Sequence, residues 1–211
     1  MINDNRLAGA LKTAAKTRLL YREDGGVVDM IAPDWAMSTT MDVMRKEMRK
    51  SLSQLVEMLG EIPHGCRIEI TKAKDSYAVQ DVIESVFEEE LDFRHTQELP
   101  CVCKVTALQF RGYRLMQTHG GRIVGVEEEL LSLRHASNIE PTTPANGTSM
   151  RWDGDGWTLT VNARRPDEAT EGERTCKLWQ ALERVTWCEW EQPEAAAEDE
   201  NQMKIGEEYT E

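Results

Sequence analysis

Hydrophobic positions in the first third of the chain recur at the three- and four-residue spacing of amphipathic helices. This spacing predicts one helix from Asn5 to Tyr21 and a longer one from Ser38 to Leu59, which Gly60 ends. The apolar stripe of the longer helix consists of Met41, Met44, Met48, Leu52, Leu55 and Leu59. We therefore expect a helix-rich N-terminal part over residues 1–63.

From residue 64 to residue 190 the two-residue alternation of strands appears beside further helical spacing. Helices are predicted over 76–92 and 168–187, and a short helical or extended segment near 127–135. Strands are predicted over 67–71 and 101–110, with a hairpin turning at Gly120 and Gly121 and a second hairpin over 150–163. The pattern predicts an α+β fold whose antiparallel sheet is built from hairpins and is followed by a C-terminal helix.

Composition places most of the negative charge near the end of the chain. The 211 residues carry a formal charge of −13, and Glu189 to Glu211 holds nine acids against Lys204, or −8, leaving −5 for residues 1–188. Residues 191–211 are poor in apolar side chains and are expected to form a disordered acidic tail. Five cysteines, an odd number, and the lack of a secretory signal pattern predict a cytoplasmic, reduced protein.

The segment MRWDGDGWTL, residues 150–159, resembles the beginning of a calcium loop because two aspartates alternate with two glycines. No carboxylate follows until Asp167, so the loop lacks the remaining ligands that calcium needs. The better interpretation is a four-residue hairpin connection at 153–156, with Trp152 and Trp157 facing each other across the strands.

Zinc and covalent catalysis are weaker hypotheses. Cys101 and Cys103 share a strand face, and His64 and Cys66 form a similar pair, but one-residue gaps wrap a metal poorly. We expect these cysteines to be small apolar residues, with metal binding by Cys66, Cys101 and Cys103 left open. The sequence has no nucleophile elbow and no phosphate-binding glycine loop, and it predicts no cofactor. An enzyme on an unfamiliar scaffold would have to use His95, His119, Asp153, Asp155 or the cysteines.

Partner binding is the function that the sequence favours. The acidic run Glu88, Glu89 and Glu90 predicts a charged face, and Trp187 and Trp190 lie beside the acidic tail as candidate anchors. Methionine is adaptable at interfaces, so Met41, Met44 and Met48 are candidates for either core or contact surface. We expect a non-enzymatic protein that engages a macromolecule with a basic surface, as an inhibitor or an accessory factor of phage or mobile-element type. Homo-oligomers stay open.

The alternative is a nucleic-acid-binding accessory protein. Lys12, Lys16 and Arg18 on the first predicted helix, with Arg45 and Arg49 on the second, could form a basic face that contacts phosphates.

Overall fold

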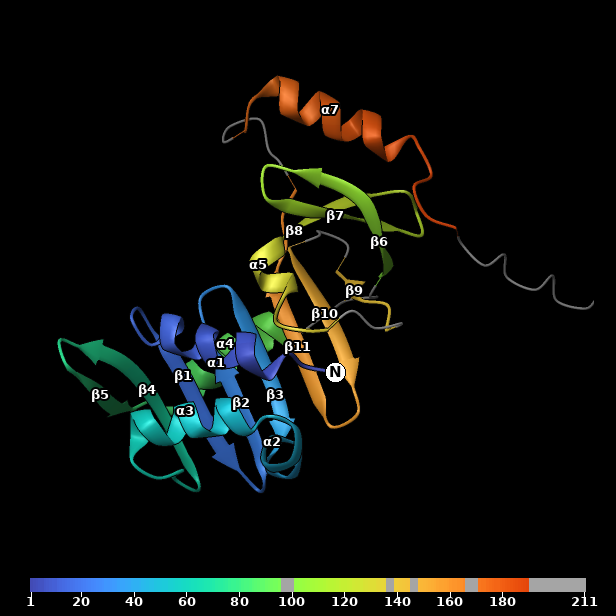
Figure 1. Cartoon of the computed structure of the whole chain (residues 1–211). Coiled ribbons are helices and arrows are strands. Elements are labelled where there is room, and N and C mark those ends of the chain that lie inside the picture. Colours follow the sequence, from blue (N-terminus) through green and yellow to red (C-terminus); the bar gives the residue numbers. More distant parts are fainter. Residues whose placement is uncertain (96–100, 136–138, 145–147, 166–170, 190–211) are drawn as a thin grey trace, which may run out of the picture.

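The computed structural model describes residues 1–95, 101–135, 139–144, 148–165 and 171–189. Eleven strands form one sheet in the order β5-β4-β1-β2-β3-β11-β10-β9-β6-β7-β8, and each neighbouring pair is antiparallel (Figure 1). The strands are β1 Leu19–Asp24, β2 Val27–Ile31, β3 Trp35–Thr40, β4 Cys66–Ala73, β5 Ser76–Asp81, β6 Cys101–Phe110, β7 Tyr113–Thr118, β8 Ile123–Glu127, β9 Thr142–Thr143, β10 Ser149–Gly154 and β11 Trp157–Asn162. The helices are α1 Asp4–Ala14, α2 Met41–Glu47, α3 Arg49–Leu59, α4 Glu84–His95, α5 Glu128–Leu131 and α7 Glu173–Glu183.

The predicted α+β class and antiparallel sheet are confirmed, but the helix-rich N-terminal part is wrong. The first helix ends at Ala14, and β1, β2 and β3 occupy much of the region before residue 41. These strands are covered on both faces, so their buried positions run together as in VVDMI and do not alternate. The predicted 38–59 helix is divided at Met48, whose backbone leaves the helical region at φ −123° and ψ 44°.

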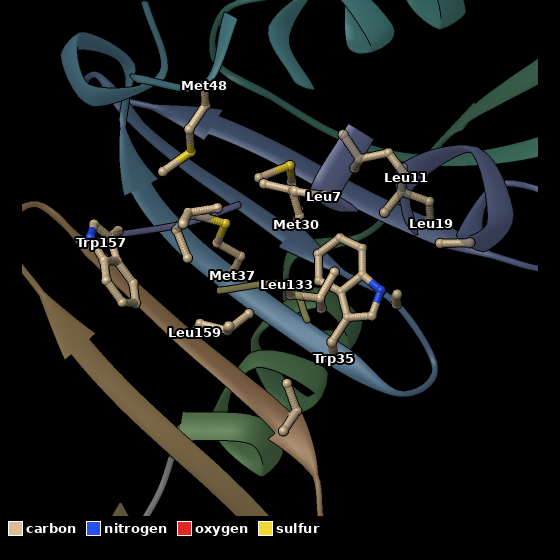
Figure 2. Packing of buried hydrophobic residues seen from close by; sticks show 14 of the residues in the cluster. Leu7, Leu11, Leu19, Met30, Trp35, Met37, Met48, Leu133, Trp157 and Leu159 are labelled. Carbon is tan, nitrogen blue, oxygen red and sulfur yellow. The ribbon is translucent and has the colours of Figure 1, made fainter. Parts of the chain in front are cut away.

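The main core lies between the sheet and α1, α2 and α3. Leu7 and Leu11 of α1 are fully buried against Met30 and Met37 of the strands (Figure 2). The Asp4 carboxylate accepts hydrogen bonds of 2.8 Å from the amides of Lys50 and Ser51, and it therefore caps α3 and fixes it beside α1.

The opposite face of the sheet carries α4, which Figure 1 shows behind the strands. Its apolar contact is small: Leu20, Ile31, Ala36 and Phe87 form the buried cluster, and Val82 packs beside them. Ion pairs supply the rest of the described contact. The helix predicted over 76–92 is wrong for residues 76–81, because these form the edge strand β5. The turn before β5 has Lys74 at φ 53° where a glycine would have indicated a hairpin.

Both predicted C-terminal hairpins are present, but the second differs in register. Trp152 pairs with Leu159 and Trp157 pairs with Gly154, so the two indoles are diagonal neighbours and not directly opposite. The turn has two residues, Asp155 and Gly156, because β10 continues through Gly154. A Cβ at Gly154 would lie 2.1 Å from the Trp157 ring, which explains why glycine is needed there.

Candidate binding groove

A hollow with a cavity volume of about 520 Å³ lies between α1, the β2–β3 turn and α5. Hydrogen bonds fix its walls. The amide of Asn3 donates to Leu133 O at 2.8 Å, which ties the start of α1 to the end of α5. The amide of Asn162 donates to Asp34 O at 2.8 Å, which holds the tip of the β2–β3 turn against β11.

Small side chains of α1 line one wall of this hollow. They are Gly9, Ala10, Thr13 and Ala14, followed by Thr17 just beyond the helix. Gly9 is exposed inside a helix, where glycine costs about 1 kcal/mol relative to alanine, and a Cβ there would meet no atom within 4 Å. The intramolecular packing does not demand glycine at this position. The helix therefore exposes its backbone toward the hollow at the expense of its own stability.

Carboxylates gather at one end of the groove. A second hollow of about 380 Å³ shares Asp34, Glu127 and Leu130 with the first, so the two hollows adjoin each other. Glu129 lines the first hollow only, and Arg6 is its basic lining residue. The described lining of the first hollow thus carries three acids and one base, a formal charge of −2.

Around the second hollow, polar contacts hold the side chains in place. The Tyr113 hydroxyl donates to Glu127 Oε1 at 2.9 Å, and the Arg164 guanidinium stacks over the Tyr113 ring at 4.4 Å. Arg164 also pairs with Glu171, which neutralises its charge locally. Burial raises the pKa of the Tyr113 hydroxyl, and the hydrogen bond to Glu127 raises it further, so Tyr113 stays protonated and donating at neutral pH.

The arrangement is suited to binding. None of the described lining residues of either hollow is a cysteine or a histidine, the usual nucleophile and general base. The groove instead offers a wall of small residues, an apolar side formed by Leu130 and Trp35, and carboxylates at one end. Such a surface can hold a chain segment and pair with a positive group on it.

The acids predicted to meet a partner are mostly engaged within the chain. Glu88 pairs with Arg22, and Glu90 accepts from Arg18 at 2.8 Å. Glu89 is exposed. The α4 face is therefore neutralised from the sheet below it, and it presents less free negative charge than the sequence suggests.

The other predicted contact residues are scattered. Met44 and Met48 are fully buried and Met41 is 8% exposed, so the methionine stripe is core. Trp187 is 38% exposed, and its indole donates to Leu182 O at 2.8 Å. Trp190 and the 191–211 tail lie outside the described residues. Among the described residues, the acids of α4, the methionine stripe and Trp187 do not form one surface.

The predicted basic residues separate onto two faces. Arg18 lies under α4, paired with Glu69 and Glu90, and so leaves the predicted basic face. Lys12 pairs with Glu57 at 3.7 Å while staying exposed. Lys16, Arg45 and Arg49 are exposed on the α1–α3 side of the sheet.

The metal and catalytic candidates do not converge. Strands β1, β2, β3, β11, β10 and β9 separate β4, which begins at Cys66, from β6, which contains Cys101 and Cys103. In the part of the chain that the structure describes, no three His, Cys, Asp or Glu side chains are grouped to hold a metal ion. Burial raises the pKa of the Cys103 thiol to about 12, which leaves it a poor nucleophile. His119 is exposed at the β7–β8 turn, and Asp153 accepts hydrogen bonds from Arg151 and Thr158 within its hairpin.

Sequence reasoning missed the groove residues Gly9, Asp34 and Glu127. Only Gly9 gave a usable indication, since a glycine inside a helical pattern often has a packing or binding reason. Asp34 and Glu127 lie at a turn and at a strand end, and nothing in the sequence indicates that they line one hollow.

No family model matches the sequence, and no curated protein matches it. Among solved structures, the chain is similar to the DNA polymerase β subunit of Streptococcus pyogenes, with 9% identity and a TM-score of 0.31 over 80% of this chain and 66% of that one. It is also similar to the DNA polymerase III subunit β sliding clamp of Bartonella birtlesii, with 11% identity and a TM-score of 0.25 over 80% and 66%. A third structure, the DNA polymerase III subunit β of Pseudomonas aeruginosa, has 12% sequence identity and a TM-score of 0.26, over 79% of this chain and 63% of that one. The chain thus spans about two thirds of each, and with TM-scores this low the groove is interpreted from its own geometry.

Proposed function

We propose that this protein is a non-enzymatic binding protein that holds an extended, basic peptide segment of a partner in the groove beside α1. The single observation that carries the proposal is the pair of adjoining hollows, with a wall of small residues in the first and carboxylates lining both. The partner class agrees with the acidic composition, but the contact surface differs from the α4 face suggested by the sequence.

The dimensions of the groove fit a short stretch of chain. From Asn5 to Ala14 the helix rises about 14 Å, at 1.5 Å per residue. An extended peptide advances about 3.3 Å per residue, so roughly four residues lie along this wall. Gly9 and Ala10 allow the peptide backbone to approach the helix closely, as small residues do at tight contacts.

Charge selects the occupant. Asp34 and Glu127 line both hollows, so a lysine or arginine placed at their junction would meet two carboxylates. Charge-assisted hydrogen bonds to carboxylates are the stronger class of hydrogen bond. Because Arg6 is the basic member of the described lining of the first hollow, an acidic peptide would meet net repulsion.

The test is selection of a random seven-residue peptide library on the full chain. We expect the selected sequences to contain a lysine or arginine beside small or apolar residues. Their binding should weaken at least ~10-fold in Thr13→Trp, which fills the groove, and should weaken and lose salt dependence in Asp34→Asn/Glu127→Gln.

The matched control is Lys12→Trp, which places the same ring on the neighbouring position of α1 outside the groove lining. Circular dichroism checks that each variant is folded. If the library yields no selected peptide, or if Thr13→Trp and Lys12→Trp bind the selected peptides equally well, the groove is not the binding site.

A further inference from the structure

The face of the protein that carries α1, α2 and α3 has the opposite charge from the chain as a whole. Exposed residues of these helices comprise six bases and three acids: Arg6, Lys12, Arg45, Lys46, Arg49 and Lys50 against Asp42, Glu47 and Glu57. Their formal sum is +3, in a chain of −13. This excess lies on one side of the sheet, so it is a local positive surface in an acidic protein.

Four of the bases lie on either side of the junction between α2 and α3. Arg45 and Lys46 occupy the last turn of α2, and Arg49 and Lys50 the first turn of α3, across the bend at Met48. We call these four residues the junction patch. All four are exposed, and none forms an ion pair with another residue of the described ranges.

The positive surface continues past the end of α1. Lys16 is exposed there, and the amide of Lys72 donates to Ala15 O at 2.6 Å, which brings the β4–β5 hairpin alongside. Lys72 and Lys74 are exposed on that hairpin. The acidic α4 lies on the far side of the sheet, which keeps its carboxylates away from this surface.

We propose that the α1–α3 face binds the phosphate backbone of double-stranded nucleic acid, with the junction patch as its main contact. An eleven-residue helix such as α3 is about 16 Å long, and 16 Å of B-form duplex carries about nine phosphate charges. Contacts of this kind are independent of base sequence. The site is separate from the peptide groove and does not depend on it.

Double strands are favoured over single strands by the composition of the face. Proteins that bind single strands stack bases on exposed aromatic rings. None of the exposed residues of α1, α2 and α3 is aromatic. An anionic membrane is disfavoured because Val56 is the large apolar residue exposed on these helices, and interfacial helices bury a broad apolar face.

The experiment measures binding of the full chain to a fluorescent 30-base-pair DNA duplex of random sequence by anisotropy, between 50 and 200 mM salt. The variant changes Arg45, Lys46, Arg49 and Lys50 to alanine. We expect at least ~10-fold weaker binding at the lowest salt, and a slope of log affinity against log salt that is shallower by about 3–4, because each lost phosphate contact removes about 0.9. The matched control changes four exposed bases in and around α7 and the β7–β8 turn to alanine, with the same loss of charge: Arg122, Arg174, Lys177 and Arg184.

The proposal is overturned if the unmodified chain does not bind the duplex, or if the two quadruple variants lose affinity equally. It is also overturned if vesicles of phosphatidylcholine and phosphatidylserine bind through the junction patch more tightly than the duplex does. Tighter binding to an equally long single strand would overturn the choice of double strands. The peptide test with Thr13→Trp is unaffected by any of these results.

Discussion

Replacing Arg22 should reveal how strongly the fold depends on the buried ion pair between β1 and β2. The Arg22 side chain is 17% exposed, and its guanidinium donates to Asp29 Oδ2 at 2.8 and 2.6 Å. It also pairs with Glu88 and stacks over the Phe87 ring at 4.9 Å. The Asp29 carboxylate is 2% exposed and accepts a second hydrogen bond, from Ser38 at 2.6 Å. Arg22→Met would therefore leave a buried carboxylate without its counter-ion.

The expected loss is about 3 kcal/mol of unfolding free energy, the lower end of the ~3–5 kcal/mol range for breaking a buried ion pair, because Arg22 keeps some solvent contact. The comparison is Arg67→Met, which removes a similar side chain from a pair with Glu84, whose own side chain is 67% exposed. Exposed pairs contribute ~0–1 kcal/mol, so Arg67→Met should be nearly neutral.

Urea unfolding at pH 7, followed by far-ultraviolet circular dichroism, measures both losses. A double variant, Arg22→Met/Asp29→Asn, removes the stranded charge and should be about 1–2 kcal/mol more stable than Arg22→Met alone. If Arg22→Met costs no more than Arg67→Met, or if Asp29→Asn gives no recovery, the buried Arg22–Asp29 pair does not stabilise the fold as argued.

Three further predictions use the same unfolding assay. Gly154→Ala should lower the free energy of unfolding by about 1–3 kcal/mol, since its Cβ would overlap the Trp157 ring. Gly9→Ala should raise the free energy of unfolding by about 0.5–1 kcal/mol, and equal effects of the two changes would refute the packing argument. Burial raises the pKa of Glu23, but hydrogen bonds from His64, Gly65 and Gly26 outweigh this effect and hold that pKa below the ordinary 4.5. The stabilisation by the Glu23 carboxylate is therefore present above pH 4.5 and is lost as the pH falls through the lowered pKa. The wild type should lose more unfolding free energy than Glu23→Gln over that window, and parallel pH curves for the two proteins would contradict this. Trp179→Ala should lower the free energy of unfolding by about 3–5 kcal/mol and make α7 sensitive to proteolysis, because the indole is 4% exposed and donates a hydrogen bond to Ile123 O. The control Leu178→Ala changes a side chain that is 45% exposed and should leave α7 resistant to proteolysis.

The sequence predicted the regular parts of the fold and misjudged the beginning. Strand β6, the two C-terminal hairpins and the region of α7 follow from alternation and turn residues. The strands β1, β2 and β3 were missed because both of their faces are covered, so LLY and VVDMI lack the alternation by which a strand is recognised. Short apolar runs of this kind do not distinguish strand from helix, and Leu19 happened to continue the spacing of α1.

The candidate sites were less predictable because they depend on contacts distant in sequence. Arg18 was predicted to belong to the basic face of a helix, and Glu88 and Glu90 to an exposed acidic face. Arg18 and Glu90 are 72 positions apart in the sequence, and Arg22 and Glu88 are 66 positions apart, yet the fold pairs them. Local patterns could show that these residues are charged, but only the topology decides that they neutralise each other.

This pairing also changes what the overall charge means. The formal charge of the chain is −13, but Glu88 and Glu90 of α4 form ion pairs with Arg22 of β1 and with Arg18 just before it, on the opposite side of the sheet from α1, α2 and α3. The exposed bases of those three helices have fewer acids beside them than the composition implies. Helix α1 then separates two surfaces of different character, since Gly9 and Thr13 line the groove while Lys12 belongs to the positive face. Apart from Arg6, which lines the groove and is also one of the six exposed bases, the side chains proposed to contact a peptide and those proposed to contact a duplex are different.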